Sequence, residues 1–249
     1  MMYRAVIVDL DRTLLRTDKT ISEYSVQVLR GLRERGVLLF VATARPERAI
    51  TDYLKLVDFQ AWTTLNGART ITPSEVFEDA IEGASAACIL EQLARVDGAV
   101  ISLETDDGIY SNVDIPLWEP KVEKDLGAVS LAHRVYKIIV SHPTIPLDKL
   151  PVEMPSDVYC SVADGKLMQV MSAEATKWNG INEMLGAFGI SPSEAVYFGD
   201  DNDDVEPIRR CGRGVAVSNA LDCVKAVADA VAGSNDEDGV ARYLEEIWG

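Results

Sequence analysis

An uninterrupted apolar stretch near the N-terminus, closed by two carboxylates, most constrains what this chain can fold into. Residues 5–8 show no alternation of polar and apolar side chains, which is typical of a strand buried on both faces of a parallel sheet. Asp9 and Asp11 follow at the carboxyl end of this strand, where open α/β sheets bind ligands. Two carboxylates about 4 Å apart repel by roughly 4 kcal/mol at an effective dielectric of about 20. The pair therefore predicts a hard cation, and Mg²⁺ is the expected one because it takes carboxylate oxygens and water.

Strands and helices alternate over the first part of the chain. An amphipathic helix is expected over residues 22–35, with Ser22 as its cap, and a second helix begins near Pro46. Buried strands are expected over residues 37–42 and 62–65. This order of strand, helix, strand, helix and strand predicts a parallel sheet with crossover helices.

The pattern changes between residues 72 and 167. Shorter strands joined by hairpins are expected there, because Asp106-Asp107-Gly108 and Asp164-Gly165 are turn signals between apolar runs. The segment therefore predicts a separate α+β unit. Its expected strands are residues 99–103, 109–112, 135–140, 158–162 and 167–170.

The first pattern resumes after Met171. The expected elements are a helix over 175–188, strands over 195–198 and 215–217, and helices over 220–230 and 239–247. The predicted fold class is α/β, with a Rossmann-like, doubly wound parallel core sheet and an inserted α+β cap domain. The core would comprise residues 1–71 and 168–249, and the cap residues 72–167.

Composition excludes several classes of function. The net charge is −16, from 40 acidic and 24 basic residues, so no basic stripe is available for nucleic acid or for an anionic membrane. No segment has the pattern of a signal peptide, and no apolar run is long enough to span a bilayer. With only two histidines, a zinc site or a Ser-His-Asp triad is not expected. The cysteines lack paired metal-ligand spacing and are expected to be reduced, mostly buried thiols of a cytoplasmic protein: Cys88, Cys160, Cys211 and Cys223.

Polar side chains that suit phosphoryl transfer occupy four loops of the predicted core. An aspartate can attack phosphorus and form an aspartyl-phosphate, and a second carboxylate can protonate the leaving oxygen. A hydroxyl and an ammonium could hold the phosphoryl oxygens, and a distal carboxylate could complete a metal site. The residues concerned are Asp9 and Asp11 in the first loop, Thr43 in the second, Lys177 in the third, and Asp200 with Asp204 in the fourth.

These motifs resemble those of the haloacid dehalogenase superfamily of phosphatases. The resemblance is to the Cof-type group, which carries a C2-type α+β cap inserted after the third core strand. The family motif Asp-x-Asp-Gly-Thr-Leu stands here as residues 9–14, with Arg12 in place of glycine. The motif Ala-Thr-Gly-Arg stands as residues 42–45, with Ala44 in place of glycine.

The second half of the predicted core carries the remaining matches. The motif Gly-Asp-x-x-Asn-Asp stands as residues 199–204, with Asp203 in place of asparagine. Lys177 matches the family's lysine, and Asn66 lies in a softer match, Asn66-Gly67-Ala68.

The resemblance implies a role for each matched residue. Asp9 would be the nucleophile and Asp11 the general acid and base, while Thr43 and Lys177 would bind the transferring phosphoryl group. Asp9, Asp200 and the backbone carbonyl of Asp11 would ligate Mg²⁺. The resemblance further implies that Asp203 and Asp204 support this site, and that phosphate or substrate contacts come from Leu10, Arg12, Ala44 and Asn66.

The activity implied by the resemblance is that of a Mg²⁺-dependent phosphatase. It would hydrolyse a phosphomonoester of a small metabolite, such as a sugar phosphate, through an aspartyl-phosphate. Two alternatives stay open: a phosphosugar mutase on the same scaffold, and a catalytically weak protein that binds phosphometabolites or signals. A receiver-type module is disfavoured because its phosphorylated aspartate usually follows the third strand, whereas Asp9 follows the first. The expected partner is a small phosphorylated metabolite, with no nucleic acid and no membrane, and the chain is expected to be a monomer, with a dimer as the alternative.

Overall fold

The chain folds into two compact units. The structure, a computed structural model, describes residues 3–163 and 165–249, with Ala163 described for its backbone only. The core unit contains the segment that ends at Phe77 together with Thr176–Gly249, and the inserted unit is Glu78–Ala175. The core unit is therefore discontinuous in sequence.

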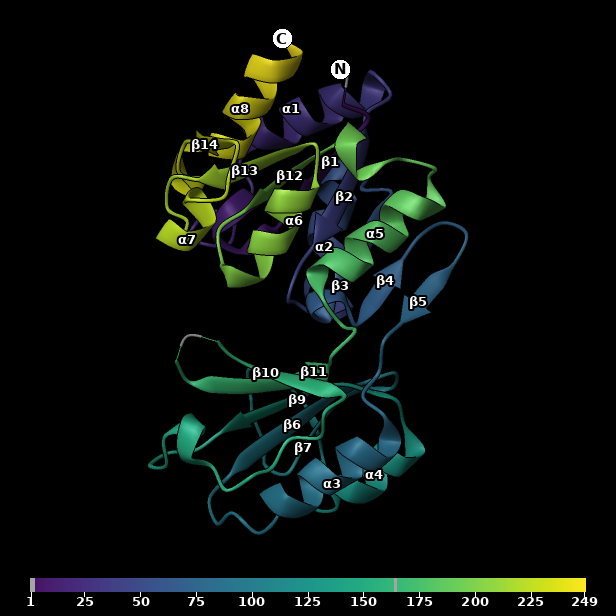
Figure 1. Ribbon diagram of the computed structural model, residues 1–249, viewed down its shortest axis with the longest axis vertical. Helices are drawn as coiled ribbons and strands as arrows, with labels where there is room; N and C mark the ends of the chain where they lie inside the picture. The colour runs from purple at the N-terminus through teal and green to yellow at the C-terminus, as the bar shows by residue number, and fades with distance from the viewer. Residues whose placement is uncertain (1–2, 164) are drawn as a thin grey trace. The chain divides into compact units, whose positions relative to one another are not determined.

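The core unit is built on an eight-stranded sheet in the order β14-β13-β12-β1-β2-β3-β4-β5 (Figure 1). Strand β1 (Ala5–Val8) lies between β12 (Ala195–Gly199) and β2 (Leu38–Ala42), and both neighbours are parallel to it. Every residue of β1 is buried, which explains its unbroken apolar sequence. The predicted α/β class with a parallel core sheet is confirmed. The other strands of this sheet are β3 (Ala61–Thr64), β4 (Arg69–Ile71), β5 (Val76–Glu78), β13 (Arg213–Val217) and β14 (Ala230–Ala232).

Strands β4 and β5 extend this sheet beyond the predicted core. Strand β4 runs antiparallel to β3, and β5 follows it at the edge. The boundaries expected from the sequence, after residues 71 and 167, fall a few residues before the ends of the compact units. The first of these places β5 in the cap domain, and the second divides β11 (Leu167–Ser172), a strand of the other sheet.

Helices of the core unit cover both faces of its sheet. Helix α1 (Glu23–Glu34) packs with α8 (Gly239–Trp248), and α5 (Lys177–Ala187) packs with α6 (Val205–Arg210). The two pairs lie on opposite faces (Figure 1), because right-handed crossovers from β1 and from β12 move in opposite directions along the sheet. Ser22 caps α1 as predicted, accepting a hydrogen bond from the Ser25 amide at 2.9 Å. The remaining helices are α2 (Thr51–Val57), after a 3₁₀ turn at Glu47–Ala49, and α7 (Asp222–Lys225).

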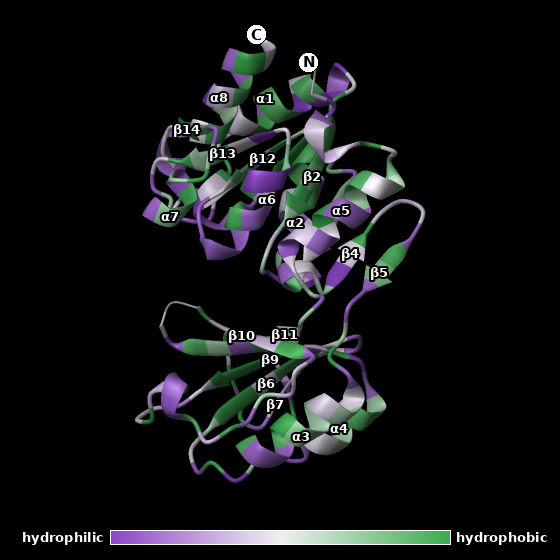
Figure 2. Cartoon of the chain, viewed as in Figure 1, coloured by the Kyte–Doolittle hydropathy of each residue, from purple (hydrophilic) through white to green (hydrophobic). Residues whose placement is uncertain are grey.

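One expectation for the core unit is wrong, and one helix was missed. The helix expected over 220–230 is the short α7 only, because the chain then turns and β14 pairs with β13, with Ala230 opposite Val215. Helix α6 was not expected at all. Figure 2 shows why the strands were easier to predict: β2 is almost uniformly hydrophobic, whereas the short helices α6 and α7 mix polar and apolar residues.

The inserted unit has a six-stranded sheet in the order β10-β11-β9-β6-β7-β8. Its strand pairs are antiparallel except for the parallel pair β7 and β8. Helices α3 (Gly83–Leu93) and α4 (Leu126–Ala132), which the sequence analysis did not predict, pack together and bury one face of this sheet. The α+β character expected for the insert is thus present. The strands are β6 (Val100–Thr105), β7 (Gly108–Ser111), β8 (Lys121–Val122), β9 (Val135–Ser141), β10 (Val158–Ala163) and β11.

The strands on either side of each expected hairpin turn of the insert are paired with each other. Gly108 has a φ of 112° in the turn between β6 and β7, a conformation that glycine adopts without strain. Strands β10 and β11 are also paired antiparallel, and Gly165 has a φ of 65°. Asp164, the other residue of that expected turn, lies outside the described residues.

Two further expectations concern the burial of the cysteines and the absence of a membrane-spanning segment. All four cysteines are free thiols, but only Cys211 is buried, so the expectation of mostly buried cysteines is wrong. Within the described ranges, no helix combines the length and the apolar composition that crossing a bilayer requires.

Candidate active site

The predicted site residues of the core unit gather at one edge of its sheet. Asp9 directly follows β1, Thr43 directly follows β2, and Asp200 directly follows β12. Because these three strands are parallel neighbours, their carboxyl ends meet at the same edge. Lys177 joins them as the first residue of α5, whose N-terminus is capped by the Thr176 hydroxyl.

Lys177 connects the first loop to the last. Its Nζ lies 2.9 Å from Asp9 Oδ1 and 2.7 Å from Asp204 Oδ1, and its side chain is almost fully buried. Asp203 Oδ1 lies 3.3 Å away. Burial alone would lower the pKa of the Lys177 ammonium, but the three carboxylates outweigh it and raise that pKa well above its usual value. Lys177 is therefore positively charged in the folded protein.

Asp204 organises the loop after β12. Its Oδ2 accepts hydrogen bonds from the amides of Asp200, at 2.8 Å, and Asp201, at 3.0 Å. Its Oδ1 accepts from Lys177 and from the buried Tyr197 hydroxyl. Gly199 has no side chain because a Cβ there would lie 2.5 Å from the Asp204 carboxylate carbon. With both oxygens engaged, Asp204 has the contacts of a residue that positions its neighbours.

Three buried carboxylates could together hold a cation. Asp9, Asp200 and Asp204 each offer an oxygen, and these atoms lie within 4.8 Å of one another. Burial raises the pKa of Asp9 well above its usual value, since the opposing Lys177 charge offsets it only in part. Burial, with Asp204 nearby, raises the pKa of Asp200 to about 7. Such crowding of buried carboxylates fits a hard divalent cation, which would stabilise the charged forms.

Thr13 binds one oxygen of Asp200, and Arg12 lies near the other. The Thr13 hydroxyl donates to Asp200 Oδ1 at 3.0 Å, and Arg12 Nε lies 3.7 Å from Asp200 Oδ2. Both residues belong to a tight turn over Leu10–Leu14, in which Leu14 and Leu15 amides bond back to the carbonyls of Asp9 and Leu10. The Leu10 side chain is fully buried, so only its main chain could contact a ligand.

Asp11 lies apart from the carboxylates around Lys177. Arg45 binds both of its oxygens, with Nε at 2.6 Å and Nη2 at 2.7 Å, and Lys19 Nζ lies 2.7 Å from Oδ1. Burial alone would raise the pKa of Asp11, but the hydrogen bonds from Arg45 and Lys19 lower it to about 2. The carboxylate is therefore ionised and held by two cations.

The loops after β2 and β3 are joined by backbone and side-chain bonds. Thr43 is buried, its carbonyl accepts from the Asn66 amide at 3.1 Å, and its Oγ1 accepts from the Arg45 amide at 3.2 Å. Asn66 Nδ2 donates to Asp203 Oδ2 at 2.8 Å. Ala44, next to Thr43, is exposed at this edge. Asp203 thus links Lys177 to the loop after β3.

Sequence reasoning missed several residues of this site. Arg45 and Thr13 stand inside the quoted motifs, so the motifs themselves were the available signal. Tyr197 looked like an ordinary member of an apolar strand. Lys19 carries no sequence signal, because only the folded loop brings it to Asp11.

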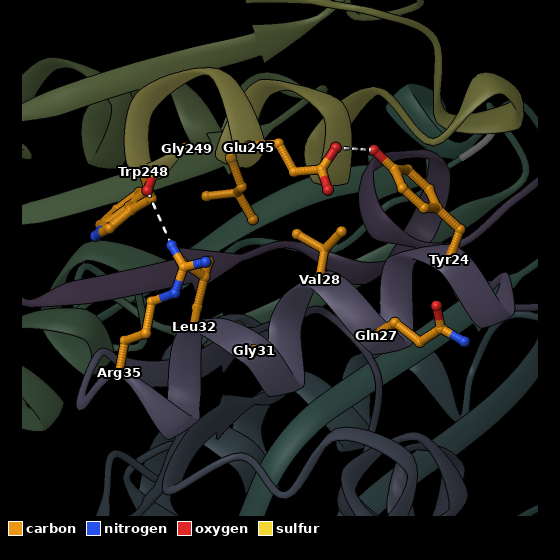
Figure 3. A pocket seen from close by; sticks show the side chains of 10 residues that line it. Tyr24, Gln27, Val28, Gly31, Leu32, Arg35, Glu245, Trp248 and Gly249 are labelled. Carbon is orange, nitrogen blue, oxygen red and sulfur yellow. Dashed lines mark hydrogen bonds between the residues drawn. The ribbon is translucent and has the colours of Figure 1, made fainter.

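A pocket of the core unit lies between α1 and α8 (Figure 3). It has a volume of about 350 Å³, and the predicted site residues are absent from the described side chains that line it. Tyr24 donates to Glu245 on one side, and Arg35 Nη1 donates to the Trp248 carbonyl at 2.9 Å on the other. This pocket is formed by the helix pair and is separate from the carboxylate site.

Comparison with known proteins covers nearly the whole chain. The family profile of haloacid dehalogenase-like hydrolases matches residues 6–244. The chain is 25% identical to the Bacillus subtilis 5-amino-6-(5-phospho-D-ribitylamino)uracil phosphatase YitU over 98% of this chain and 97% of the relative. It is 26% identical to the Escherichia coli pyridoxal phosphate phosphatase YbhA over 98% of each chain. The crystal structure of TM0651 from Thermotoga maritima superposes with a TM-score of 0.88 at 23% identity, over 98% of this chain and 97% of that one, which shows the same fold.

Proposed function

This chain belongs to the haloacid dehalogenase-like hydrolases, and on that premise we propose that it hydrolyses phosphate monoesters of small metabolites at the site around Asp9. The observation that carries the proposal is the convergence of Asp9, Thr43, Lys177 and Asp200 at the carboxyl edge of three parallel strands. Two relatives of similar identity are phosphatases by name, for substrates that differ in chemistry. The relatives therefore support phosphatase activity for this chain more strongly than they support either of their substrates.

The proposed first step is attack of the Asp9 carboxylate on phosphorus. A bond forms between an Asp9 oxygen and phosphorus, the bond from phosphorus to the ester oxygen breaks, and Asp11 supplies a proton to that oxygen. Water then attacks phosphorus, loses its proton to Asp11, and releases phosphate and free Asp9. Lys177 and the Thr43 hydroxyl would hold the phosphoryl oxygens during both transfers.

Mg²⁺ is the proposed cofactor. Asp9 and Asp200 would hold it with their carboxylates and Asp11 with its backbone carbonyl, and Asp204 would support the loop that presents Asp200. The bound ion would neutralise charge on the phosphoryl group. Asp203 and Asn66 would align Lys177, since Asp203 contacts both. Leu10 and Ala44 would contribute main-chain contacts to phosphate.

The proposed substrate is a sugar phosphate or a similar small phosphorylated metabolite. The protein is proposed to act in the cytoplasm as a monomer, and the inserted unit at 78–175 is proposed to be a cap domain. A phosphosugar mutase would use the same first step and return the phosphoryl group to the sugar. Conversion of a hexose phosphate into its isomer, with no free phosphate released, would identify that activity.

One observation favours a catalytically weak variant as the second candidate. Asp11, the proposed general acid, is paired with Arg45 and Lys19. If these pairs persist with substrate bound, phosphate esters would bind and turn over slowly. Tight binding of a phosphate ester, without hydrolysis over hours, would support this alternative.

The direct test is an assay with 4-nitrophenyl phosphate and Mg²⁺. We expect turnover that chelation abolishes and that Asp9→Asn lowers by about a thousandfold or more, since the covalent route is lost. Lys55→Gln on α2 is the matched control, because that exposed lysine has no contact with the site residues. Absence of turnover, or turnover that survives Asp9→Asn, would rule the proposal out.

A further inference from the structure

Arg12 occupies a backbone conformation that favours glycine. Its φ of 59° and ψ of 8° lie in the left-handed region, where a side chain with a Cβ is strained. This conformation belongs to the tight turn after β1, which places the Thr13 hydroxyl within hydrogen-bond distance of Asp200. A glycine would satisfy this turn, so the arginine side chain is not required for the backbone path.

The backbone at Arg12 is firmly held. Asn219 Nδ2 donates to the Arg12 carbonyl at 2.7 Å, and Asn219 Oδ1 accepts from the Asn235 amide at 3.0 Å. Asn235 Nδ2 in turn donates to the Leu15 carbonyl at 3.0 Å. The root of the Arg12 side chain therefore has a fixed position beside the carboxylate site.

The guanidinium is close to Asp200 but only weakly bound. Arg12 Nη2 donates to the Asn219 carbonyl at 3.3 Å, and Nε lies 3.7 Å from Asp200 Oδ2. The side chain is 60% exposed. Among residues 3–163 and 165–249 these contacts use few of its N–H donors, so a planar fork that suits carboxylate or phosphate stays available at the rim.

Charge balance explains why a second anion would need this residue. The site gathers four carboxylates, from Asp9, Asp200, Asp203 and Asp204, and Lys177 is already shared by three of them. These charges repel any anion beyond the one phosphoryl group that Lys177 and a cation can hold. Arg12 is an exposed positive charge beside this cluster, and its 3.7 Å contact with Asp200 is looser than the 2.7 Å contact of Lys19, another exposed cation nearby, with Asp11.

We propose that Arg12 determines specificity by binding a second anionic group, a carboxylate or a phosphate, located on the substrate close to the phosphoester. The inference rests on the proposed phosphatase function and narrows its substrate class. Phosphorylated hydroxy acids and bisphosphates would be preferred over neutral sugar phosphates of similar size.

The test compares two esters that differ at one group. 3-Phosphoglycerate carries a carboxylate where glycerol 3-phosphate carries a hydroxymethyl group. We expect the parent protein to favour 3-phosphoglycerate in kcat/KM, and Arg12→Gly to lower the ratio of the two values by about tenfold or more, as loss of a charge-assisted bidentate contact does. Arg12→Lys should keep part of the preference, because an ammonium retains the charge but not the fork.

A matched control removes an arginine from the opposite edge of the sheet. Arg33, in the last turn of α1, pairs with Asp58, and Arg33→Gly should leave the ratio unchanged. An unchanged ratio in Arg12→Gly, or an equal fall in Arg33→Gly, would overturn the inference.

Binding separates this inference from the proposed function. In an Asp9→Asn background, calorimetric dissociation constants for the same two esters should show the same dependence on Arg12. If 4-nitrophenyl phosphate is not hydrolysed while 3-phosphoglycerate binds through Arg12, the proposed function fails and the inference stands. If the aryl ester is hydrolysed while 3-phosphoglycerate binds no more tightly than glycerol 3-phosphate, the inference fails alone.

Discussion

Lys177 carries the electrostatic balance of the candidate site at the scale of single residues. Its ammonium lies between Asp9 and Asp204, and all three side chains are almost fully buried. Removing one partner from a buried ionic group leaves the others without compensation, which is costlier than the loss of an exposed pair. The same ammonium would hold the phosphoryl group, so stability and activity should depend on it together.

Lys177→Met should therefore destabilise the protein by about 3 kcal/mol and lower kcat/KM by about a hundredfold or more. The cause is the repulsion among Asp9, Asp203 and Asp204 once the ammonium is gone. Urea unfolding, followed by circular dichroism, measures the first effect, and the aryl phosphate assay measures the second.

Lys55→Met is the control for this substitution. Lys55 pairs with Asp52 at 3.7 Å on an exposed face of α2, and its loss should change the unfolding free energy by less than about 0.5 kcal/mol. Equal effects of the two substitutions would contradict the assignment of a buried charge network.

Close packing between elements fixes where Lys177 begins its helix. Gly67, in the turn between β3 and β4, has a φ of 104°, and a Cβ there would lie 2.0 Å from the Thr176 carbonyl oxygen. Thr176 caps α5, so this contact sets the position of the helix N-terminus that carries Lys177. The β3–β4 turn thus acts as a support for the site without touching a ligand.

Gly67→Ala should cost about 2–4 kcal/mol and lower kcat, because both the backbone conformation and the space exclude a methyl group. Gly186→Ala in α5 is the matched control, since a Cβ there meets no atom within 4 Å. That control should stabilise the protein by up to about 1 kcal/mol, as alanine favours the helix. Thermal unfolding of both variants gives the comparison, and a neutral Gly67→Ala would refute the packing argument.

Asp238 joins the loop after β1 to the start of α8. Both of its oxygens accept from Arg16 Nη2, at 2.9 and 3.0 Å, and Ser25 Oγ lies 3.3 Å away. Burial alone would raise the pKa of Asp238, but the hydrogen bonds of Ser22 and Arg16 outweigh it and lower that pKa below its usual value. A carboxyl group with a lowered pKa adds stability above its ordinary pKa of about 4, and this stability is lost as pH falls.

Asp238→Asn should consequently destabilise the protein by about 1 kcal/mol at pH 7, with the difference shrinking below about pH 4. Asparagine tolerates the left-handed φ of 59° at this position, so the backbone is preserved. Unfolding free energies measured by urea titration from pH 3 to pH 7 check the trend. A difference that grows on acidification would have the wrong sign for this linkage.

The elements differed in how far the sequence could predict them. Unbroken apolar runs such as Ala5–Val8 were predicted correctly, because burial on both faces leaves a plain signal. The inserted helices α3 and α4 were missed, since short strands and turns dominated the segment around them. Strand β14 was not predicted, and the helix expected over 220–230 ran into its first residue, because the pairing of β14 with β13 is a tertiary contact that local propensity does not report.

Two compact units make up the whole molecule, and the proposed metal ligands all belong to the core unit. Motifs read from the sequence brought together the residues at the carboxyl edge of the core sheet. They could not show that Asp11 pairs with Arg45 and Lys19, because that choice depends on side-chain positions in the folded loop. The motifs also could not identify residues of the inserted unit that contact a substrate, because no motif lies in that unit.

Mg²⁺ should stabilise the core unit selectively. Binding at 100 times the dissociation constant adds about 2.7 kcal/mol to the unit that holds the ion. Hydrogen exchange should slow in β1 and β12, which end at Asp9 and Asp200, while the amides of β6 and β9 in the inserted unit keep their rates. Mass spectrometry of peptides after hydrogen exchange, with and without chelator, measures these exchange rates.

Asp200→Asn is the variant that checks the assignment of the metal site. It should abolish the Mg²⁺-dependent protection of β1 and β12, because one of the proposed carboxylate ligands is gone. Protection that persists in Asp200→Asn, or that extends equally to β6 and β9, would exclude this site.

The pairing of β1 with β12 sets an order of events during synthesis. Residues 78–175 form a continuous unit, whose strand pairs all lie within that segment, and can close while the ribosome is still translating the rest. Strand β1 emerges first but has a partner only on the β2 side until β12 is made. In the nascent chain, the edge of the apolar strand β1 that later pairs with β12 must therefore stay unpaired while the insert folds. A chain that ends before residue 195 would lack β12 and Asp200, so the edge of the sheet that carries the candidate site would be incomplete.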